Sequence, residues 1–165
     1  MEAETVIKLL DNTYCKNIIS LILPIQQIEF NVPITLDGQP DLLDIETNYH
    51  KTGGGFWGAV NDGQLVGTIG LICPGHNAGV IRKMFVHKNF RGKEHGTAQR
   101  LLDTLTAHCK GEQITDICLG TVDILKAAHR FYEKNGLVRV EKTNMPSFFP
   151  FMMSDNVYYH LHLND

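Results

Sequence analysis

The order of strand-like and helical segments between residues 80 and 121 constrains this chain more than any other feature. The stretch that ends in "IRKMFVH" predicts a strand, residues 96–110 predict a helix, and "DICLGT" at residues 116–121 predicts a second strand. The helix is amphipathic because its apolar residues recur at i, i+3, i+4 and i+7. These residues are Ala98, Leu101, Leu102 and Leu105. A strand–helix–strand unit closes with a right-handed crossover, so we expect its two strands to be parallel.

The segments on either side of this unit predict antiparallel strands. Residues 55–87 contain three strand-like runs, and Asp62-Gly63 between the first two is typical of a two-residue hairpin. The chain ends in two further strand-like runs, "LVRVEK" and "NVYYHLHL". We therefore predict one α/β domain of the α+β kind over residues 1–165, with a mixed, mostly antiparallel central sheet and helices on both faces.

The remaining segments predict a first strand, "TVIKLL", and three more helices. In "YCKNIISLILPIQQIEF", Pro24 should kink or split the helix, since proline lacks a backbone donor. A short helix is expected around "PDLLDIETNYHK", and another in "DILKAAHRFYEKN" between an Asp123 N-cap and a left-handed Gly136. The apolar stripes expected on the first two are Ile18, Ile22, Ile25 and Ile28, and Leu42, Leu43 and Ile45.

The composition, with 43% hydrophobic and 20% charged residues, is that of an ordinary globular protein. The four cysteines form no CxxC pair, so we expect buried thiols rather than a zinc or redox site. They are Cys15, Cys73, Cys109 and Cys118. His160 and His162 share a strand face but have no third ligand beside them, so no metal is expected. The longest apolar run, "IISLILPI", is far shorter than the roughly 20 residues of a membrane span, and we expect a cytoplasmic protein that does not bind membranes.

The net charge of −3 is unevenly distributed along the chain. Residues 1–76 contain nine acids and three bases, a net of −6, and residues 77–165 contain twelve bases and nine acids, a net of +3. An anionic ligand for the second part and a cationic one for the first would fit this division, and so would two differently solvated faces. The basic residues neither run together nor alternate with aromatic residues, so nucleic acid is not expected as a partner.

The junction "FVHKNFRGKEHGTAQRLLDTL" has the properties of an anion site. Unpaired backbone N–H groups and the positive end of the helix dipole stabilise a phosphate at a helix N-terminus. Gly92 and Gly96 allow the backbone to approach a ligand closely, and Thr97 and Ala98 add little bulk. The junction lacks the Lys-Ser or Lys-Thr pair of a Walker A loop and the glycine spacing of a dinucleotide fingerprint, so ATP and NAD are disfavoured.

Two motifs resemble the GNAT superfamily of N-acetyltransferases. "KEHGTA" is similar to the superfamily's acyl-CoA loop, in which Gln or Arg is followed by Gly at the fourth and Gly or Ala at the sixth position. Downstream, Ala128, Tyr132 and Gly136 fill the places of a recurrent Ala, Tyr and Gly in "AAHRFYEKNGLVRV". The resemblance extends from about residue 55 to the C-terminus. Two departures are Lys93 in place of the usual Gln or Arg, and Leu125 where Asn is frequent.

The resemblance implies the acyl-CoA N-acyltransferase fold, with its parallel strand pair splayed at the cofactor site, and direct acetyl transfer from acetyl-CoA to a primary amine. It implies oxyanion stabilisation by backbone N–H groups of a bulged strand at residues 84–86, and Tyr132 as the acid that protonates the thiolate. The structural alternative for Tyr132 is a core tyrosine beside Phe131. The implied cofactor-binding residues are Met84, Phe85, Val86, Arg91, Gly92, Lys93, Glu94, His95, Gly96, Thr97, Ala98, Ala128 and Phe131.

The acceptor amine must lose a proton before it attacks, but no spacing in the sequence marks a base. Glu29 is the first candidate and Asp41 the weaker one, and a solvated carboxylate at a helix end is an equal interpretation of Glu29. The residues expected to contact the acceptor, a small molecule, amino-acid derivative or peptide, are Gln26, Glu29, Phe30 and Trp57. Together with the loop "MPSFFPF", they predict an apolar, aromatic pocket with an acidic group.

Two other functions remain open from the sequence. One is a regulatory module that binds acyl-CoA with weak or no turnover, and the other is a nucleotide-binding protein. We also expect the final strand to be exposed, so that it is able to pair between the subunits of a homodimer.

Overall fold

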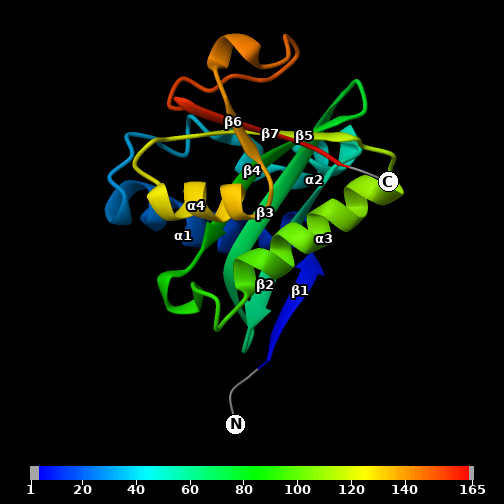
Figure 1. Ribbon diagram of the computed structural model, residues 1–165. Helices are drawn as coiled ribbons and strands as arrows, with labels where there is room; N and C mark the ends of the chain where they lie inside the picture. Colours follow the sequence, from blue (N-terminus) through cyan, green and yellow to red (C-terminus); the bar gives the residue numbers. More distant parts are fainter. Residues whose placement is uncertain (1–3, 164–165) are drawn as a thin grey trace.

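The computed structural model describes residues 4–163 and has one seven-stranded sheet beside four α-helices (Figure 1). The strand order is β1-β2-β3-β4-β5-β7-β6. The strands are β1 (Thr5–Leu9), β2 (Gly55–Asn61), β3 (Gln64–Gly75), β4 (Ala78–Val86), β5 (Asp116–Thr121), β6 (Val138–Val140) and β7 (Val157–His162). The helices are α1 (Cys15–Pro24), α2 (Ile45–Asn48), α3 (Thr97–Gly111) and α4 (Lys126–Lys134).

The sheet is mixed and mostly antiparallel, as predicted. The pair β4–β5 is parallel and is aligned by Ala78 opposite Asp116 and Val80 opposite Cys118, while the other five pairs are antiparallel. Asp62 and Gly63 turn the chain between β2 and β3 with positive φ angles of 50° and 76°. Those angles suit a hairpin turn that follows the twist of the sheet. The predicted order of meander, crossover and final antiparallel strands is therefore confirmed.

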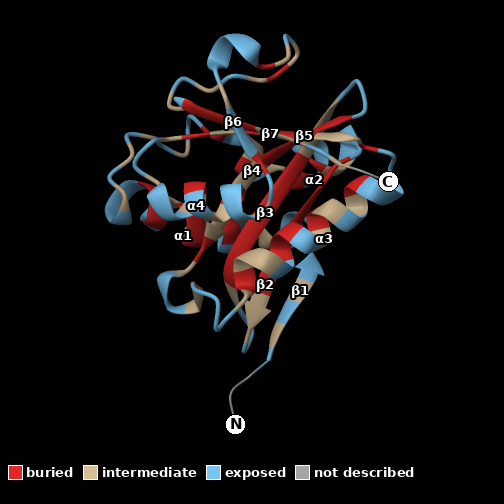
Figure 2. Cartoon of the chain, viewed as in Figure 1, coloured by how far each residue is buried: buried red, intermediate tan, exposed pale blue. Residues whose placement is uncertain are grey.

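Helices cover both faces of the sheet. On one face, α3 and α4 pack against a core that contains Leu101, Leu105 and Tyr132. On the other face, α1 and α2 contribute Ile18 and Ile45 to a second core. Figure 2 shows the middle of β3 buried throughout, whereas buried and exposed residues alternate along α3. The sheet is thus the shared inner layer, and each helix keeps a polar face outward.

The N-terminal helix changes its winding after Pro24. The α-helix ends there, and residues Ile25–Glu29 form a π-helix in which the Phe30 N–H donates to the Ile25 carbonyl at 3.1 Å. Since a π-turn contains more residues than an α-turn, it rotates later side chains away from the original stripe. Ile28 is consequently 80% exposed, so its predicted place in the buried stripe is wrong. The predicted interruption at Pro24 is confirmed.

Residues 40–52 form three short helical turns rather than one helix. Asp44 separates the first two because its backbone is not helical, with φ −153° and ψ 82°. Its carboxylate accepts a hydrogen bond from the Thr47 N–H at 3.1 Å and so caps α2. Leu43 is 59% exposed, so the predicted stripe is wrong at this residue, while Leu42 and Ile45 are fully buried.

For the last α-helix, α4, the predicted N-cap is wrong and the predicted C-terminal glycine is confirmed. α4 begins at Lys126 with Leu125 at its N-cap position and no side-chain cap, so Asp123 does not cap it. Asp123 instead uses its N–H to donate to Asn156 Oδ1. Gly136 ends the helix with φ 90°, as predicted. Its conformation allows the Leu137 N–H to reach back to the Tyr132 carbonyl at 3.1 Å.

The final strand is not an edge of the sheet. β7 lies between β5 and β6 and pairs with both of them, so β1 and β6 are the two edges. The prediction of an exposed final strand that pairs between subunits is therefore wrong, because β6 occupies the side of β7 that such a pairing would need.

The cysteines are all free, but they are not all buried. Cys109 and Cys118 are buried, whereas Cys15 and Cys73 are half-buried, which corrects the prediction of four buried thiols. Within residues 4–163, no helix has both the length and the apolar composition that a membrane crossing requires. The cytoplasmic location stays a prediction.

Close packing at Gly70 of β3 supplies a test of this fold. An added Cβ would lie 2.8 Å from Tyr49 and 2.9 Å from Phe56, two fully buried rings in edge-to-face contact. We expect Gly70→Ala to lower the free energy of unfolding by about 1–3 kcal/mol in urea titrations, because rigid rings must shift. Gly111→Ala is the control, since nothing lies within 4 Å of its added methyl group. Equal stabilities of the two variants would contradict this packing.

Candidate active site

The parallel strands β4 and β5 separate after a short stretch of pairing. Their last paired residues are Val80 and Cys118, although β4 continues to Val86 and β5 to Thr121. Beyond that point β4 keeps β3 as its only partner and β5 keeps only β7. A cavity of about 860 Å³ lies along the separated ends and is lined from both strands. The splayed pair that the resemblance implied is thus present.

A β-bulge shapes the β4 side of the cavity. Thr68 of β3 faces Phe85 and Gly70 faces Arg82, so Lys83 and Met84 together oppose the single residue between them. Lys83 has a φ of 56°, and its carbonyl accepts a hydrogen bond from Thr68 Oγ1 at 2.7 Å. The extra residue turns the following backbone toward the gap between the strands. The bulge predicted in this strand is therefore confirmed.

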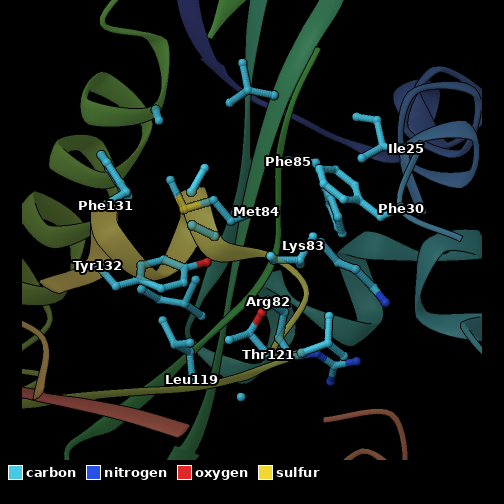
Figure 3. A pocket seen from close by; sticks show the side chains of 18 of the residues that line it. Ile25, Phe30, Arg82, Lys83, Met84, Phe85, Leu119, Thr121, Phe131 and Tyr132 are labelled. Atoms are coloured by element: carbon cyan, nitrogen blue, oxygen red, sulfur yellow. The ribbon is translucent and has the colours of Figure 1, made fainter. Parts of the chain in front are cut away.

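The cavity brings together most of the residues that the sequence predicted for cofactor and acceptor. From the cofactor set, its lining includes Met84, Phe85, Val86, Arg91, Gly92, Lys93, Gly96, Ala98, Ala128 and Phe131. It also includes Tyr132, Gln26 and Phe30, and the predicted loop contributes Phe149 and Pro150. Figure 3 shows Tyr132 and Phe131 on one side of the cavity and Phe30 with Phe85 on the other.

Five predicted residues lie outside this lining: Glu29, Trp57, Glu94, His95 and Thr97. The prediction that Trp57 forms a wall of the acceptor pocket is wrong. Trp57 is 6% exposed within the core beneath α3, where its ring contacts His108 at a centroid distance of 5.2 Å. Strand alternation explains the error, because Trp57 lies on the α3 face of β2 while its neighbour Phe56 enters the core of α1 and α2.

The loop before α3 retains several free backbone donors. The N–H groups of His95 and Gly96 both bond to the Gly92 carbonyl, at 3.2 and 3.1 Å. Among the described residues, no protein acceptor is bonded to the N–H groups of Gly92, Lys93, Thr97 or Ala98. Gly92 and Gly96 have φ angles of 99° and 64°, which glycine adopts without strain. The loop therefore has free backbone N–H groups. Those of His95 and Gly96 are not among them, because they bond to the Gly92 carbonyl.

Arg91, predicted to bind the cofactor, and Glu29, predicted to act on the acceptor, form an ion pair with each other. Arg91 Nη2 donates to Glu29 Oε1 at 2.8 Å, a second contact joins Nη1 to Oε2, and Arg91 Nε donates to the Val86 carbonyl at 2.8 Å. The hydrogen bond from Arg91 lowers the pKa of Glu29 below its ordinary value. A carboxylate held in this way is a weaker base than a free one. The geometry therefore disfavours Glu29 as the group that deprotonates the acceptor.

Tyr132 places a protonated hydroxyl in the cavity. The side chain is 5% exposed, and burial raises its pKa above the ordinary value. Figure 3 shows its hydroxyl oxygen directed toward the middle of the cavity. No protein group within residues 4–163 forms a hydrogen bond with that oxygen. The proton is therefore retained at neutral pH and is available to a bound ligand.

Five charged residues of the cavity were missed: Arg82, Lys83, Arg130, Lys134 and Asp155. Two adjacent cations in the apolar run "GVIRKMFV" were a signal in the sequence, because buried strands rarely contain charges without a use for them. Asp155 had no such signal, since it lies in a loop far along the chain. These residues correct the expectation of an apolar pocket with only an acidic group.

Lys83 joins the bulge to the segment before α2. Its Nζ donates to Gln39 Oε1 at 2.5 Å and lies 3.9 Å from Asp41 Oδ2. Gln39 in turn exchanges two hydrogen bonds of 3.0 Å with Gln26, and Tyr49 donates its hydroxyl to Asp41 at 2.6 Å. Burial lowers the pKa of Lys83 to about 8. Asp41, the weaker candidate base, is thus engaged in this network.

His160 and His162 both contact Asp116 Oδ1, at 2.9 and 3.1 Å. Within the described part of the chain, no group of three or more His, Cys, Asp or Glu side chains is arranged to hold a metal ion. The two histidines therefore form a local pair with one carboxylate at the end of β5.

The chain belongs to the GNAT acetyltransferase family. Residues 52–138 match the family model described as an acetyltransferase (GNAT) domain. A crystal structure of a GNAT-family acetyltransferase from Staphylococcus aureus Mu50 superposes with a TM-score of 0.94 at 40% identity, over 98% of this chain and 100% of that one. The PaiA N-acetyltransferase of Thermoplasma acidophilum, crystallised with coenzyme A, shares the fold with a TM-score of 0.74 at 15% identity, over 97% and 99% of the two chains.

Curated relatives match over a shorter region. The N-acetylaspartate synthetase of Danio rerio is 37% identical over 105 residues, which cover 62% of this chain and 36% of that protein. The alignment thus spans about a third of the relative's length.

The lowered pKa of Lys83 predicts a pH-dependent stability. Between about pH 8 and the ordinary lysine pKa of 10.5, the unfolded chain retains the lysine proton more than the folded chain does. The free energy of unfolding therefore rises with pH across this window, by on the order of 3 kcal/mol. We expect urea titrations of Lys83→Met to lack this rise, while Lys88→Met, which changes an exposed lysine, retains it. Parallel curves for the wild type and Lys83→Met would contradict the shift.

Proposed function

We propose that this protein transfers the acetyl group of acetyl-CoA to the primary amine of a small molecule, an amino-acid derivative or a peptide. The observation that carries the proposal is the cavity between β4 and β5, which has free backbone donors at one end and the Tyr132 hydroxyl within it. Membership in the GNAT family supports the reaction class. The activity named for the Danio rerio relative, N-acetylaspartate synthetase, supports an amino-acid acceptor.

The residues at the α3 end of the cavity fit the diphosphate of coenzyme A. Gly92, Lys93 and Ala98 present N–H groups without protein acceptors, and Lys93 adds a positive charge. A helix N-terminus with free donors stabilises phosphate oxygens through hydrogen bonds and the helix dipole. Coenzyme A bound to a structural neighbour of the same fold supports this assignment. Arg91 would join these contacts only by leaving Glu29.

The splayed edge of β4 fits the reacting end of the thioester. Attack by the amine on the thioester carbonyl carbon forms a C–N bond and places negative charge on the carbonyl oxygen. Backbone N–H groups from Met84 of the bulge to Val86 are suited to stabilise that charge at the edge of the cavity. When the C–S bond breaks, the Tyr132 hydroxyl gives its proton to the thiolate. The amine's proton must pass to a base other than Glu29.

Ligand-dependent melting tests the cofactor assignment. We expect coenzyme A and acetyl-CoA to raise the melting temperature by several degrees at about 100 times Kd, because they bind only the folded chain. ATP and NAD at the same concentration should leave it unchanged, since the loop lacks their binding patterns. Stabilisation by ATP or NAD but not by coenzyme A would overturn the assignment.

Tyr132→Phe tests the acid. We expect kcat for acetyl transfer to fall by at least about 10-fold, because general acid catalysis contributes at least that much, while melting shifts with coenzyme A persist. Tyr14→Phe is the matched control, since its hydroxyl contacts Lys8 outside the cavity. Release of free thiol during turnover with an amine panel measures the rate. An unchanged kcat in Tyr132→Phe would contradict the assigned role, and coenzyme A binding without turnover on any amine would favour a regulatory module.

A further inference from the structure

We infer that the acceptor is a free amino acid bound at both ends, with its carboxylate on the Arg82 guanidinium and its amino group at the Asp155 carboxylate. This inference rests on the proposed acetyl transfer in the same cavity and names the substrate class. Arg82 and Asp155 both line the cavity, as do Tyr132 and the splayed end of β4.

Arg82 is a cation without a carboxylate partner. Its Nη2 contacts Met152 Sδ at 3.7 Å, and within residues 4–163 no carboxylate oxygen lies within 4.0 Å of the guanidinium. The neighbouring Lys83 differs, because Gln39 and Asp41 occupy its ammonium group. A guanidinium is well suited to hold a carboxylate through two parallel hydrogen bonds. Arg82 is therefore a cation of the β4 wall that is available to an acceptor's carboxylate, whereas Arg130 and Lys134, which also line the cavity, belong to α4.

The Asp155 carboxylate lies against Gly120 of β5, on the side of the cavity opposite β4. A Cβ added to Gly120 of β5 would lie 2.6 Å from Asp155 Oδ2, so the absence of a side chain at Gly120 admits the carboxylate to the splayed region. The Tyr158 hydroxyl donates to the Asp155 backbone carbonyl at 3.1 Å, and Asp155 lines the same cavity as Tyr132. Its carboxylate thus lies against β5 in the cavity that contains the proposed acid.

The charges around Asp155 suit a proton acceptor. Burial raises the pKa of its carboxyl above the ordinary value, and the positive charges of Arg82 and Lys83 oppose that shift. Arg82, Lys83 and Tyr132 line the same cavity, and the Tyr158 hydroxyl is bonded to the Asp155 backbone carbonyl. An acceptor ammonium would form an ion pair with the carboxylate at this position. Its proton passes to Asp155, the free amine attacks the thioester carbon, and Tyr132 protonates the departing thiolate.

The experiment compares L-amino acids with their α-amides as acceptors. The two series differ at the carboxylate, which an amide replaces with a neutral group of similar size. With saturating acetyl-CoA, we expect kcat/KM for the preferred amino acid to exceed that for its amide by about 10- to 100-fold, the range for a hydrogen bond to a charged group. A peptide acceptor would behave like the amides, because its N-terminal residue has no free carboxylate.

Substitution of Arg82 isolates the carboxylate contact. We expect Arg82→Met to lower kcat/KM for the amino acid by about 10- to 100-fold, mainly by raising KM. The kcat/KM for the amide should stay within about 3-fold of the wild-type value. Arg139→Met is the control, since Arg139 is an exposed arginine of β6 outside the cavity. An equal loss for both acceptors, or equal rates for amino acids and amides in the wild type, would overturn the inference while leaving acetyl transfer established.

Two variants test Asp155 independently. Asp155→Asn removes the proton acceptor, and Gly120→Ala displaces the carboxylate without changing it. We expect both to lower kcat for amino acids by at least about 10-fold, with the coenzyme A melting shift retained. Asp62→Asn, in the β2–β3 turn, should retain full activity. Unchanged kcat in both cavity variants would overturn the role of Asp155. Acetylation of other amines but of neither series would overturn the inference alone, and coenzyme A binding without turnover on any amine would overturn the proposed function itself.

Discussion

The loss of pairing between β4 and β5 is the constraint on which the rest of the site depends. Past Val80 and Cys118, each strand keeps a partner on its outer side only, so the two facing edges are left with backbone groups that the sheet does not pair. Such groups are costly in a closed apolar core. They are tolerated where the gap opens to a ligand or to water. The cavity is therefore a consequence of sheet topology, and the side chains only decide what it accepts.

The bulge at Lys83 makes that topology rigid. A positive φ at a residue other than glycine is strained, and surrounding contacts must over-determine it. Here Thr68 holds the carbonyl of Lys83, while Gln39 and Asp41 hold its ammonium group. Gln39 also binds Gln26 of the π-helical turn. One set of polar contacts thus connects the strand to the π-helical turn that lines the cavity through Gln26.

What the sequence could predict was local, and what it missed depends on contacts between distant segments. The parallel pair, the amphipathic stripe of α3 and the left-handed Gly136 follow from periodicity and backbone preference within short windows. The Arg91–Glu29 pair joins residues 62 positions apart, and Lys83 meets Gln39 across 44 positions. No spacing rule connects such residues. The exposure of Ile28 has a similar origin, because a change in helical winding, rather than composition, rotated it outward.

The two ends of the cavity contain different kinds of charged and polar groups. In the proposed reaction, this difference would orient acetyl-CoA and the acceptor. At the α3 end, anions would meet neutral N–H groups and the ammonium group of Lys93, while Arg91 is already neutralised by Glu29. At the other end, Arg82 and Asp155 carry opposite charges within a mostly apolar wall. Charges interact more strongly there than in water, because the local dielectric constant is lower. A polyanionic diphosphate would meet the carboxylate of Asp155 unfavourably, whereas a zwitterion satisfies both groups. In the proposed reaction, the cofactor and the acceptor would thus be directed to opposite ends of the cavity that contains Tyr132.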